Sequence, residues 1–292
     1  MTMNEAAKTI DPSRIRALAL DMDGTTIRPD STLSGQVKKA LDACAGRGIE
    51  LIICTGRSTG AAEPYRLAIG AEGPMVYYNG AEVVDMPSGK VLESTFLDLE
   101  TVDFCIDLSR KSGVYFHLFL PATDASPKER LVADAHTAET EIYKERTGLD
   151  AETGDLKRFI AESGVSGCIK GMFIASSEVL DKIKPVLEER LGNKVYLARS
   201  YHSFLEIMAA GVSKGEGLTQ ALRHRGIDPS QTIAFGDEEN DLPMFGAAAF
   251  SVAPESAKEQ VKSAADFIMP SNAEDGLAVF LEDLFGLERG GL

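Results

Sequence analysis

The sequence lacks the features of membrane proteins and of nucleic-acid-binding proteins. Its longest nearly apolar runs, such as Ala247 to Ala253, fall far short of the roughly 20 residues that a membrane helix requires. No block of lysines or arginines could follow a phosphate backbone, and 30 basic against 45 acidic residues give a formal net charge of -15. We therefore expect neither a membrane nor a nucleic acid as a partner.

Cysteine and histidine are also scarce. The chain has four cysteines without a C-x-x-C pair and four histidines without metal-ligand spacing. The sequence thus gives no support for a zinc or haem site, and we expect the cysteines to be small core side chains. The N-terminal segment is polar and lacks the apolar centre of a signal peptide, which predicts a cytoplasmic protein.

What is present indicates a globular protein of about two domains, because the 292 residues are 44% hydrophobic. Apolar strand-like segments at 15–20, 49–54 and 75–78 alternate with helix-like segments. Such alternation is typical of a parallel sheet covered on both faces. The predicted fold class is α/β, with a Rossmann-like parallel-sheet core.

The pattern changes after residue 81. Two short strands flank the turn at 86–89 and predict a hairpin, and a mixture of helices and strands follows. We therefore predict an α+β cap domain of residues 82–201, inserted into a discontinuous core of residues 1–81 and 202–292. Within the cap, the polar stretch 126–163 is expected to be mostly helical.

The loop Asp21-Met22-Asp23-Gly24-Thr25-Thr26 follows the first strand directly. In extended chain, residues two positions apart point to the same side, so Asp21 and Asp23 should repel each other. The pair is stable if a cation neutralises it or one carboxyl holds a proton, and both states are useful in catalysis. Asp and Gly also favour simple turns, but this loop next to a strand is the more specific signal.

Two other polar positions follow apolar strands. Thr55 and Gly56 end the second strand, and taken alone they also suit a strand-to-helix turn with a capping hydroxyl. Asp237 and Asp241 follow the strand at 232–235, although carboxylates at a helix start are also favourable by themselves. In a parallel sheet these positions can converge at one edge.

Lys214 lies in the first turn of a predicted helix, since Ser213 and Glu216 have capping-box spacing. The helix dipole disfavours a cation there by about 0.3 to 1 kcal/mol. A nearby anion would remove this penalty.

Together these positions suggest phosphoryl transfer. Three or four carboxylates without histidine or cysteine form an oxygen-only site that suits Mg²⁺. A carboxylate is a competent nucleophile towards phosphorus, while the metal and Lys214 would neutralise charge on the phosphoryl oxygens. A second carboxyl could protonate the leaving oxygen and then deprotonate water.

The polar positions resemble the four motifs of the haloacid dehalogenase (HAD) phosphatase superfamily, and they occur in its order. Two further segments resemble its Cof-type branch, which has a large α/β cap. The HAD motifs are Asp21-Met22-Asp23-Gly24-Thr25, Thr55-Gly56-Arg57, Lys214 and Gly236-Asp237-x-x-Asn240-Asp241, and the Cof-type segments are Asn79-Gly80-Ala81 and Phe204-Leu205-Glu206-Ile207 followed by Gly211-Val212-Ser213-Lys214-Gly215.

The resemblance implies a role for each matched residue. Asp21 would be the nucleophile, and Asp23 the general acid/base whose backbone carbonyl also binds Mg²⁺. The other expected roles are Asp21 and Asp237 as carboxylate metal ligands, Asp241 as a ligand directly or through water, Thr55 and Lys214 as phosphoryl-binding residues, and Asn240, Gly56 and Arg57 as their support. Dehalogenases of the superfamily lack a carboxylate at the position of Asp23, which argues against dehalogenation.

The leading hypothesis is a Mg²⁺-dependent phosphatase for a small phosphorylated metabolite, with a sugar phosphate as the expected substrate. A phosphomutase of the same superfamily is the alternative, although it would need a second phosphate site in the cap, where no cluster of Arg or Lys stands out. A non-catalytic metabolite-binding protein is a third hypothesis.

Overall fold

In a computed structural model of the protein, which describes residues 10–123, 126 and 128–288, the chain forms two compact units. The first comprises Met1–Ser58, Ala62–Glu93 and Ser213–Leu292, and the second comprises Thr59–Ala61 and Ser94–Val212. The predicted α/β fold with a parallel-sheet core is confirmed.

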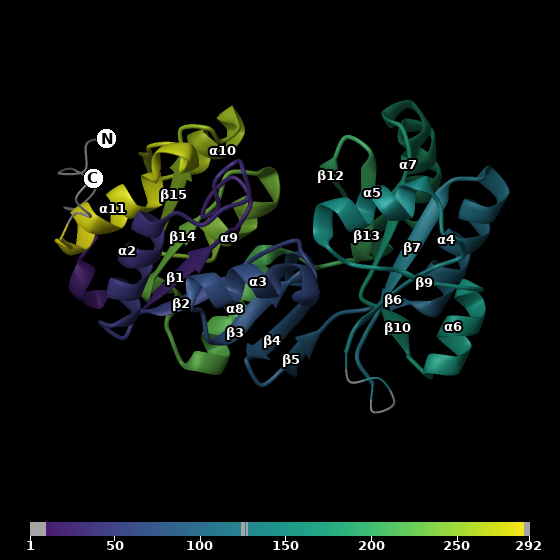
Figure 1. The fold of residues 1–292 in the computed structure, drawn as a ribbon, viewed down its shortest axis with the longest axis horizontal. Coiled ribbons are helices and arrows are strands. Elements are labelled where there is room, and N and C mark those ends of the chain that lie inside the picture. The colour runs from purple at the N-terminus through teal and green to yellow at the C-terminus, as the bar shows by residue number, and fades with distance from the viewer. Residues whose placement is uncertain (1–9, 124–125, 127, 289–292) are drawn as a thin grey trace. The chain divides into compact units, whose positions relative to one another are not determined.

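A five-stranded parallel sheet forms the centre of the first unit, in the order β16-β15-β14-β1-β2. Figure 1 labels β15, β14, β1 and β2 of this sheet. Its strands are β1 (Ala17–Leu20), β2 (Glu50–Ile53), β14 (Thr232–Phe235), β15 (Phe250–Pro254) and β16 (Phe267–Met269). A parallel bridge between Cys54 and Val76 connects β2 to a three-stranded sheet. That sheet contains β3 (Gly73–Tyr77), β4 (Glu82–Met86) and β5 (Lys90–Ser94).

Helices cover both faces of the parallel sheet. Ala19 of β1, Ile52 of β2 and Ala234 of β14 pack in one apolar cluster with residues of α8, α9 and α10. On the other face, Phe280 of α11 contacts the rings of Phe235, Phe250 and Phe267. The helices of this unit are α2 (Gly35–Ala45), α8 (Lys214–Arg225), α9 (Leu242–Gly246), α10 (Glu259–Ala264) and α11 (Gly276–Phe285), with α3 (Thr59–Ile69) shared between the units.

Local sequence explains where two of these helices begin. Ser34 is the N-cap of α2, and its hydroxyl accepts a hydrogen bond from the backbone N–H of Val37. Ser213 caps α8 in the same way by accepting from the N–H of Glu216. Pro64 lies inside α3, which continues through it to Ile69.

The second unit is built around a six-stranded mixed sheet in the order β12-β13-β11-β7-β8-β9. Its apolar face packs against α4, α6 and α7, with Phe116, Phe173 and Leu205 among the buried residues. The strands of the unit are β6 (Leu97–Asp98), β7 (Tyr115–Leu120), β8 (Arg130–Ala133), β9 (Glu152–Thr153), β10 (Gly167–Cys168), β11 (Lys170–Ile174), β12 (Val195–Tyr201) and β13 (Phe204–Ala209). The helices are α4 (Leu99–Ser112), α5 (Ala138–Thr147), α6 (Leu156–Ser163) and α7 (Ser177–Leu191).

The limits of the two units differ from the domain limits expected at 81/82 and 201/202. The hairpin of β4 and β5 stays with the first unit because β4 pairs along its whole length with β3. Strand β13 belongs to the second unit because it pairs with β11 and β12. The expectation that 126–163 is mostly helical is wrong in part: it contains α5 and α6, but also β8, which pairs with β7.

No helix in the described part of the chain is both long enough and apolar enough to cross a membrane.

Candidate active site

The candidate site lies at the carboxyl ends of β1 and β14, which are neighbours in the parallel sheet. Asp21 follows β1 directly, and its backbone N–H donates to the carbonyl oxygen of Phe235, the last residue of β14, at 3.0 Å. Asp237 follows Phe235 after a single glycine. The parallel pairing therefore brings together carboxylates that are far apart in the sequence, at the edge where ligands of such sheets bind.

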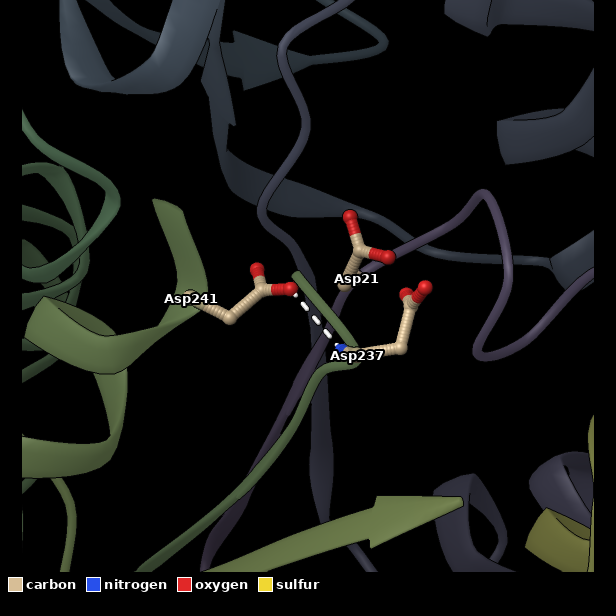
Figure 2. Close-up of side chains that lie close together, drawn as sticks. All are labelled: Asp21, Asp237 and Asp241. Carbon is tan, nitrogen blue, oxygen red and sulfur yellow. Dashed lines mark hydrogen bonds between the residues drawn. The ribbon is translucent and has the colours of Figure 1, made fainter. Parts of the chain in front are cut away.

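Asp241 completes a cluster of three carboxylates with Asp21 and Asp237. One oxygen from each residue lies within 4.8 Å of the others, and Figure 2 shows the three side chains close together, Asp21 on one segment and Asp237 and Asp241 on the loop after β14. Asp241 Oδ2 accepts hydrogen bonds from the backbone N–H groups of Asp237 and Glu238, both at 3.0 Å. The loop between Asp237 and Asp241 therefore fixes the orientation of the Asp241 carboxylate.

Lys214 joins this cluster from the first turn of α8. Its Nζ donates to Asp21 Oδ1 at 2.5 Å and to Asp241 Oδ1 at 2.7 Å, and the residue is only 2% exposed. These carboxylates supply the nearby anions that a cation at a helix start requires. Lys214 lies in the first turn of α8, as the sequence predicts, and Asp21 and Asp241 are the partners of its ammonium.

Burial and charge shift the protonation of the cluster. Burial raises the pKa of Asp21 well above its usual range, the charge of Lys214 opposes this rise, and the charges of Asp241 and Asp237 add to it. Burial is also the main reason why the pKa of Asp237 rises to about 6. Burial alone would lower the pKa of Lys214, but the charges of Asp21 and Asp241 outweigh it, so that the pKa is raised.

The donor set suits a hard divalent cation. Three carboxylates and one ammonium leave two net negative charges when all four groups are ionised, and every available ligand atom is oxygen. A divalent ion would balance these charges and favour the ionised form of Asp21 and Asp237. Asp21, Asp237 and Asp241 could therefore hold a metal ion.

Two residues of the loop after β1 shape the acidic cluster. Thr25 donates from Oγ1 to Asp237 Oδ1 at 2.8 Å, which orients that carboxylate. Gly24 has a φ of +86°, and a Cβ at this position would lie 2.2 Å from Asp237 Oδ2. Only glycine leaves room for Asp237 there. Both residues belong to the loop of residues 21–26, which the sequence marks as a candidate active-site loop, but the sequence assigns neither of them a role of its own.

Asp23 lies apart from the three clustered carboxylates. Its side chain is 57% exposed and forms a bidentate ion pair with Arg57, from Nε to Oδ2 at 2.8 Å and from Nη2 to Oδ1 at 2.6 Å. The Arg57 guanidinium also lies over the Tyr65 ring, 4.5 Å from its centroid. Arg57 is expected to support the phosphoryl-binding residues, and its guanidinium contacts Asp23 and Tyr65.

Thr55 and Gly56 follow β2, which pairs with β1, the strand that leads into Asp21. Thr55 is buried, and its Oγ1 accepts a hydrogen bond from the backbone N–H of Arg57 at 3.1 Å. Asn240 donates from Nδ2 to Asn79 Oδ1 at 2.9 Å. Sequence reasoning had noted Asn79 within a Cof-type segment without assigning it a role.

A separate cavity of about 430 Å³ lies elsewhere in the first unit, lined in part by Glu50, Gly73 and Arg225. Glu50 and Gly73 are the first residues of β2 and β3, so this cavity opens at the amino ends of the strands. The acidic cluster lies at the carboxyl ends. The cavity is therefore not part of the candidate site.

Comparison with known proteins places this geometry in context. Residues 18–281 match the family model of haloacid dehalogenase-like hydrolases. The chain is 27% identical over 285 residues to the 5-amino-6-(5-phospho-D-ribitylamino)uracil phosphatase YwtE of Bacillus subtilis (strain 168), covering 92% of this chain and 98% of that protein. It is 27% identical over 273 residues to the pyridoxal phosphate phosphatase YbhA of Escherichia coli (strain K12), covering 91% and 97%.

A solved structure is similar over nearly the whole chain. The crystal structure of a haloacid dehalogenase-like hydrolase from Bacteroides thetaiotaomicron superposes with a TM-score of 0.83 at 25% identity, covering 93% of this chain and 100% of that one.

Proposed function

The chain belongs to the haloacid dehalogenase-like hydrolases, as a phosphatase of that superfamily, and we propose that it hydrolyses a small phosphorylated metabolite through an aspartyl-phosphate on Asp21. One observation carries the proposal: Lys214 Nζ contacts both Asp21 and Asp241 within a cluster that also contains Asp237. Such an arrangement combines a nucleophile, a fixed positive charge and oxygen ligands for a metal ion.

In the first proposed step, an Asp21 carboxylate oxygen attacks phosphorus while the bond between phosphorus and the leaving oxygen breaks. Asp23 gives a proton to that oxygen, so that an alcohol leaves. Thr55 and Lys214 hold the phosphoryl oxygens, and Lys214 keeps Asp21 oriented. For this step the Asp23 carboxyl must release its ion pair with Arg57 and form a hydrogen bond to the leaving oxygen.

In the second step Asp23 takes a proton from water, whose oxygen attacks phosphorus. The bond between phosphorus and Asp21 breaks, phosphate leaves and both carboxyl groups return to their starting state. The ion pair with Arg57 suits this step, because a bidentate pair is made to the ionised carboxylate that accepts the proton.

We propose Mg²⁺ as the metal, held by the carboxylates of Asp21, Asp237 and Asp241 and by the backbone carbonyl of Asp23. When bound, it would neutralise charge on the phosphoryl oxygens. Asn240 and Gly56 would support the phosphoryl-binding residues through Asn79, which contacts both of their segments.

We propose a sugar phosphate as the substrate. The two named relatives act, by their names, on a phosphoribityl compound and on pyridoxal phosphate, which are both small phosphate monoesters. The second unit would select the group that leaves with the oxygen, since the residues proposed for the chemistry all lie in the first unit.

A phosphate-release screen over phosphorylated metabolites tests this proposal, with Mg²⁺ or EDTA and with Asp21→Asn. Asp42→Asn is a matched control, because Asp42 is a half-exposed carboxylate that pairs with Lys38 on the surface of α2. We expect Asp21→Asn and EDTA each to abolish turnover, by about 10³-fold or more, and Asp42→Asn to leave it within about twofold.

Three results would count against the proposal. Wild-type turnover in Asp21→Asn would refute the nucleophile, and turnover unaffected by EDTA would refute the metal. Consumption of a hexose phosphate with little free phosphate released would indicate a phosphomutase instead.

A further inference from the structure

The turn Tyr78–Gly80, which follows β3, has an unusual backbone. Three consecutive residues have positive φ: Tyr78 at 51°, Asn79 at 57° and Gly80 at 100°. Within the described ranges, only two other non-glycine residues have positive φ, Ser31 and Asp275. Bulky residues rarely adopt this conformation, and it persists where the surroundings determine it. The turn is therefore held by its contacts.

Asn79 links two loops of the candidate site. Its backbone N–H donates to the carbonyl oxygen of Thr55 at 2.9 Å, and its Oδ1 accepts from Asn240 Nδ2 at 2.9 Å. A Cβ on residue 56 would lie 2.9 Å from Asn79 Oδ1, so Gly56 allows the side chain to sit against the loop. The residue is 3% exposed, and its amide is directed inward.

The orientation of Asn240 depends on this contact. Among the described residues, Asn79 is the only hydrogen-bond partner of the Asn240 side chain, whose Oδ1 is buried without a donor. Asn240 directly precedes Asp241, a member of the acidic cluster. Asn79 therefore reaches the loop that carries two of the three clustered carboxylates.

Gly80 extends the same turn to the start of α8. A Cβ on Gly80 would lie 2.1 Å from the carbonyl oxygen of Ser213, the N-cap residue before Lys214. A Cβ on Gly217 would in turn lie 3.0 Å from Gly80 Cα. The turn thus touches the Thr55 loop, the Asn240 loop and the beginning of the Lys214 helix.

We propose that Asn79 is a positioning residue for the phosphoryl-transfer site. In this role Asn79 acts through its neighbours: it fixes the Thr55–Gly56 loop relative to the loop of Asp237 to Asp241. The inference rests on the proposed function for its consequence in catalysis, but the contact itself can be tested without turnover.

Asparagine combines two properties at this position. It tolerates positive φ better than other side chains, and its amide oxygen accepts the bond from Asn240. Asn79→Gly keeps the backbone conformation and removes the amide. Asn79→Asp keeps both the tolerance of positive φ and an acceptor for Asn240 Nδ2. Comparison of the two variants therefore distinguishes the effect of the backbone turn from the effect of the side-chain hydrogen bond to Asn240.

The test is a double-mutant cycle of Asn79→Gly, Asn240→Ala and the double variant. If the two amides act as one unit, each single variant lowers kcat by about 10- to 100-fold and changes KM less than about threefold. The double variant then has the same kcat as the less active of the two single variants. Asn79→Asp should recover most of the loss. Ser31→Gly, at an exposed position with positive φ, is the control and should keep wild-type kcat.

A second readout does not depend on activity. The side-chain amide resonance of Asn240, assigned by its loss in Asn240→Ala, should shift in Asn79→Gly and stay in place in Ser31→Gly. Additive losses in the cycle, or an unshifted resonance, would overturn the inference. If Asp21→Asn retained turnover while the resonance shifted, the proposed chemistry would fail and the Asn79–Asn240 contact would stand.

Discussion

His117 should make the second unit lose stability as the solution becomes acidic. The residue lies in β7 with no exposed surface, packed against the rings of Tyr115, Phe119 and Tyr143. Its Nε2 is buried and has no hydrogen-bond partner among the described atoms. Burial, helped by the charge of Lys170, lowers the pKa of His117 from 6.5 to about 3. The folded protein therefore keeps a neutral imidazole where the unfolded chain binds a proton.

The sign and size of the effect follow from proton linkage. Below the unfolded pKa of about 6.5, the unfolded chain binds a proton on His117, whereas the folded protein does not bind it until about pH 3. The free energy of unfolding therefore decreases as the pH falls from about 6.5 to about 3. At 1.36 kcal/mol per pH unit, the loss between pH 7.5 and 5.0 is about 2 kcal/mol. That is a large part of the stability of an ordinary domain.

Urea unfolding at pH 7.5 and 5.0 measures this loss, with hydrogen exchange on peptides of β7 to assign the transition to the second unit. His117→Gln and His117→Phe should both reduce the pH-dependent loss by about 2 kcal/mol, whatever their stability at pH 7.5. His136→Gln is the control, because the His136 side chain is 57% exposed. Equal pH-dependent losses in wild type and both His117 variants would show that the imidazole is protonated in the folded state.

Two further predictions concern the acidic cluster. Thr25→Val keeps the shape of the side chain but removes the hydrogen bond to Asp237, so the Mg²⁺ concentration for half-maximal activity should rise about 10- to 100-fold; an unchanged Mg²⁺ titration would contradict the orienting role. Lys214→Met removes the charge shared by Asp21 and Asp241, and kcat/KM should fall by about 10²- to 10³-fold; a loss confined to thermal stability, measured by calorimetry, would show a structural role only.

The places of the candidate residues in the fold could be predicted because these residues follow apolar strands in short, specific loops. Asp21 stands directly after β1, Asp237 one residue after β14, and Lys214 at a capped helix start. The partners of Arg57 could not be predicted, because a long side chain selects among several acceptors by geometry. The sequence marked Asn79 only by its place after an apolar strand and by the resemblance of Asn79-Gly80-Ala81 to the Cof-type branch, and neither signal shows which loops its side chain contacts.

Pairing partners decided the parts of the fold that sequence reasoning missed. Strand β8 has four residues within a polar stretch, and it is a strand because β7 offers it an edge. The hairpin of β4 and β5 has the same local pattern in either unit, so only its pairing with β3 assigns it to the first. By contrast, the sequence at 177–191 predicts a helix and α7 spans these residues, because the helical spacing of Leu180, Ile183 and Leu187 is a local signal.

The place where the chain returns to the first unit has a consequence for Lys214. The second unit ends at Val212, two residues before Lys214, and Ser213 between them caps α8. A deletion in the chain just before Val212 would therefore act on the backbone at the start of α8, and it should alter the position of the Lys214 ammonium without any change of a side chain in the acidic cluster.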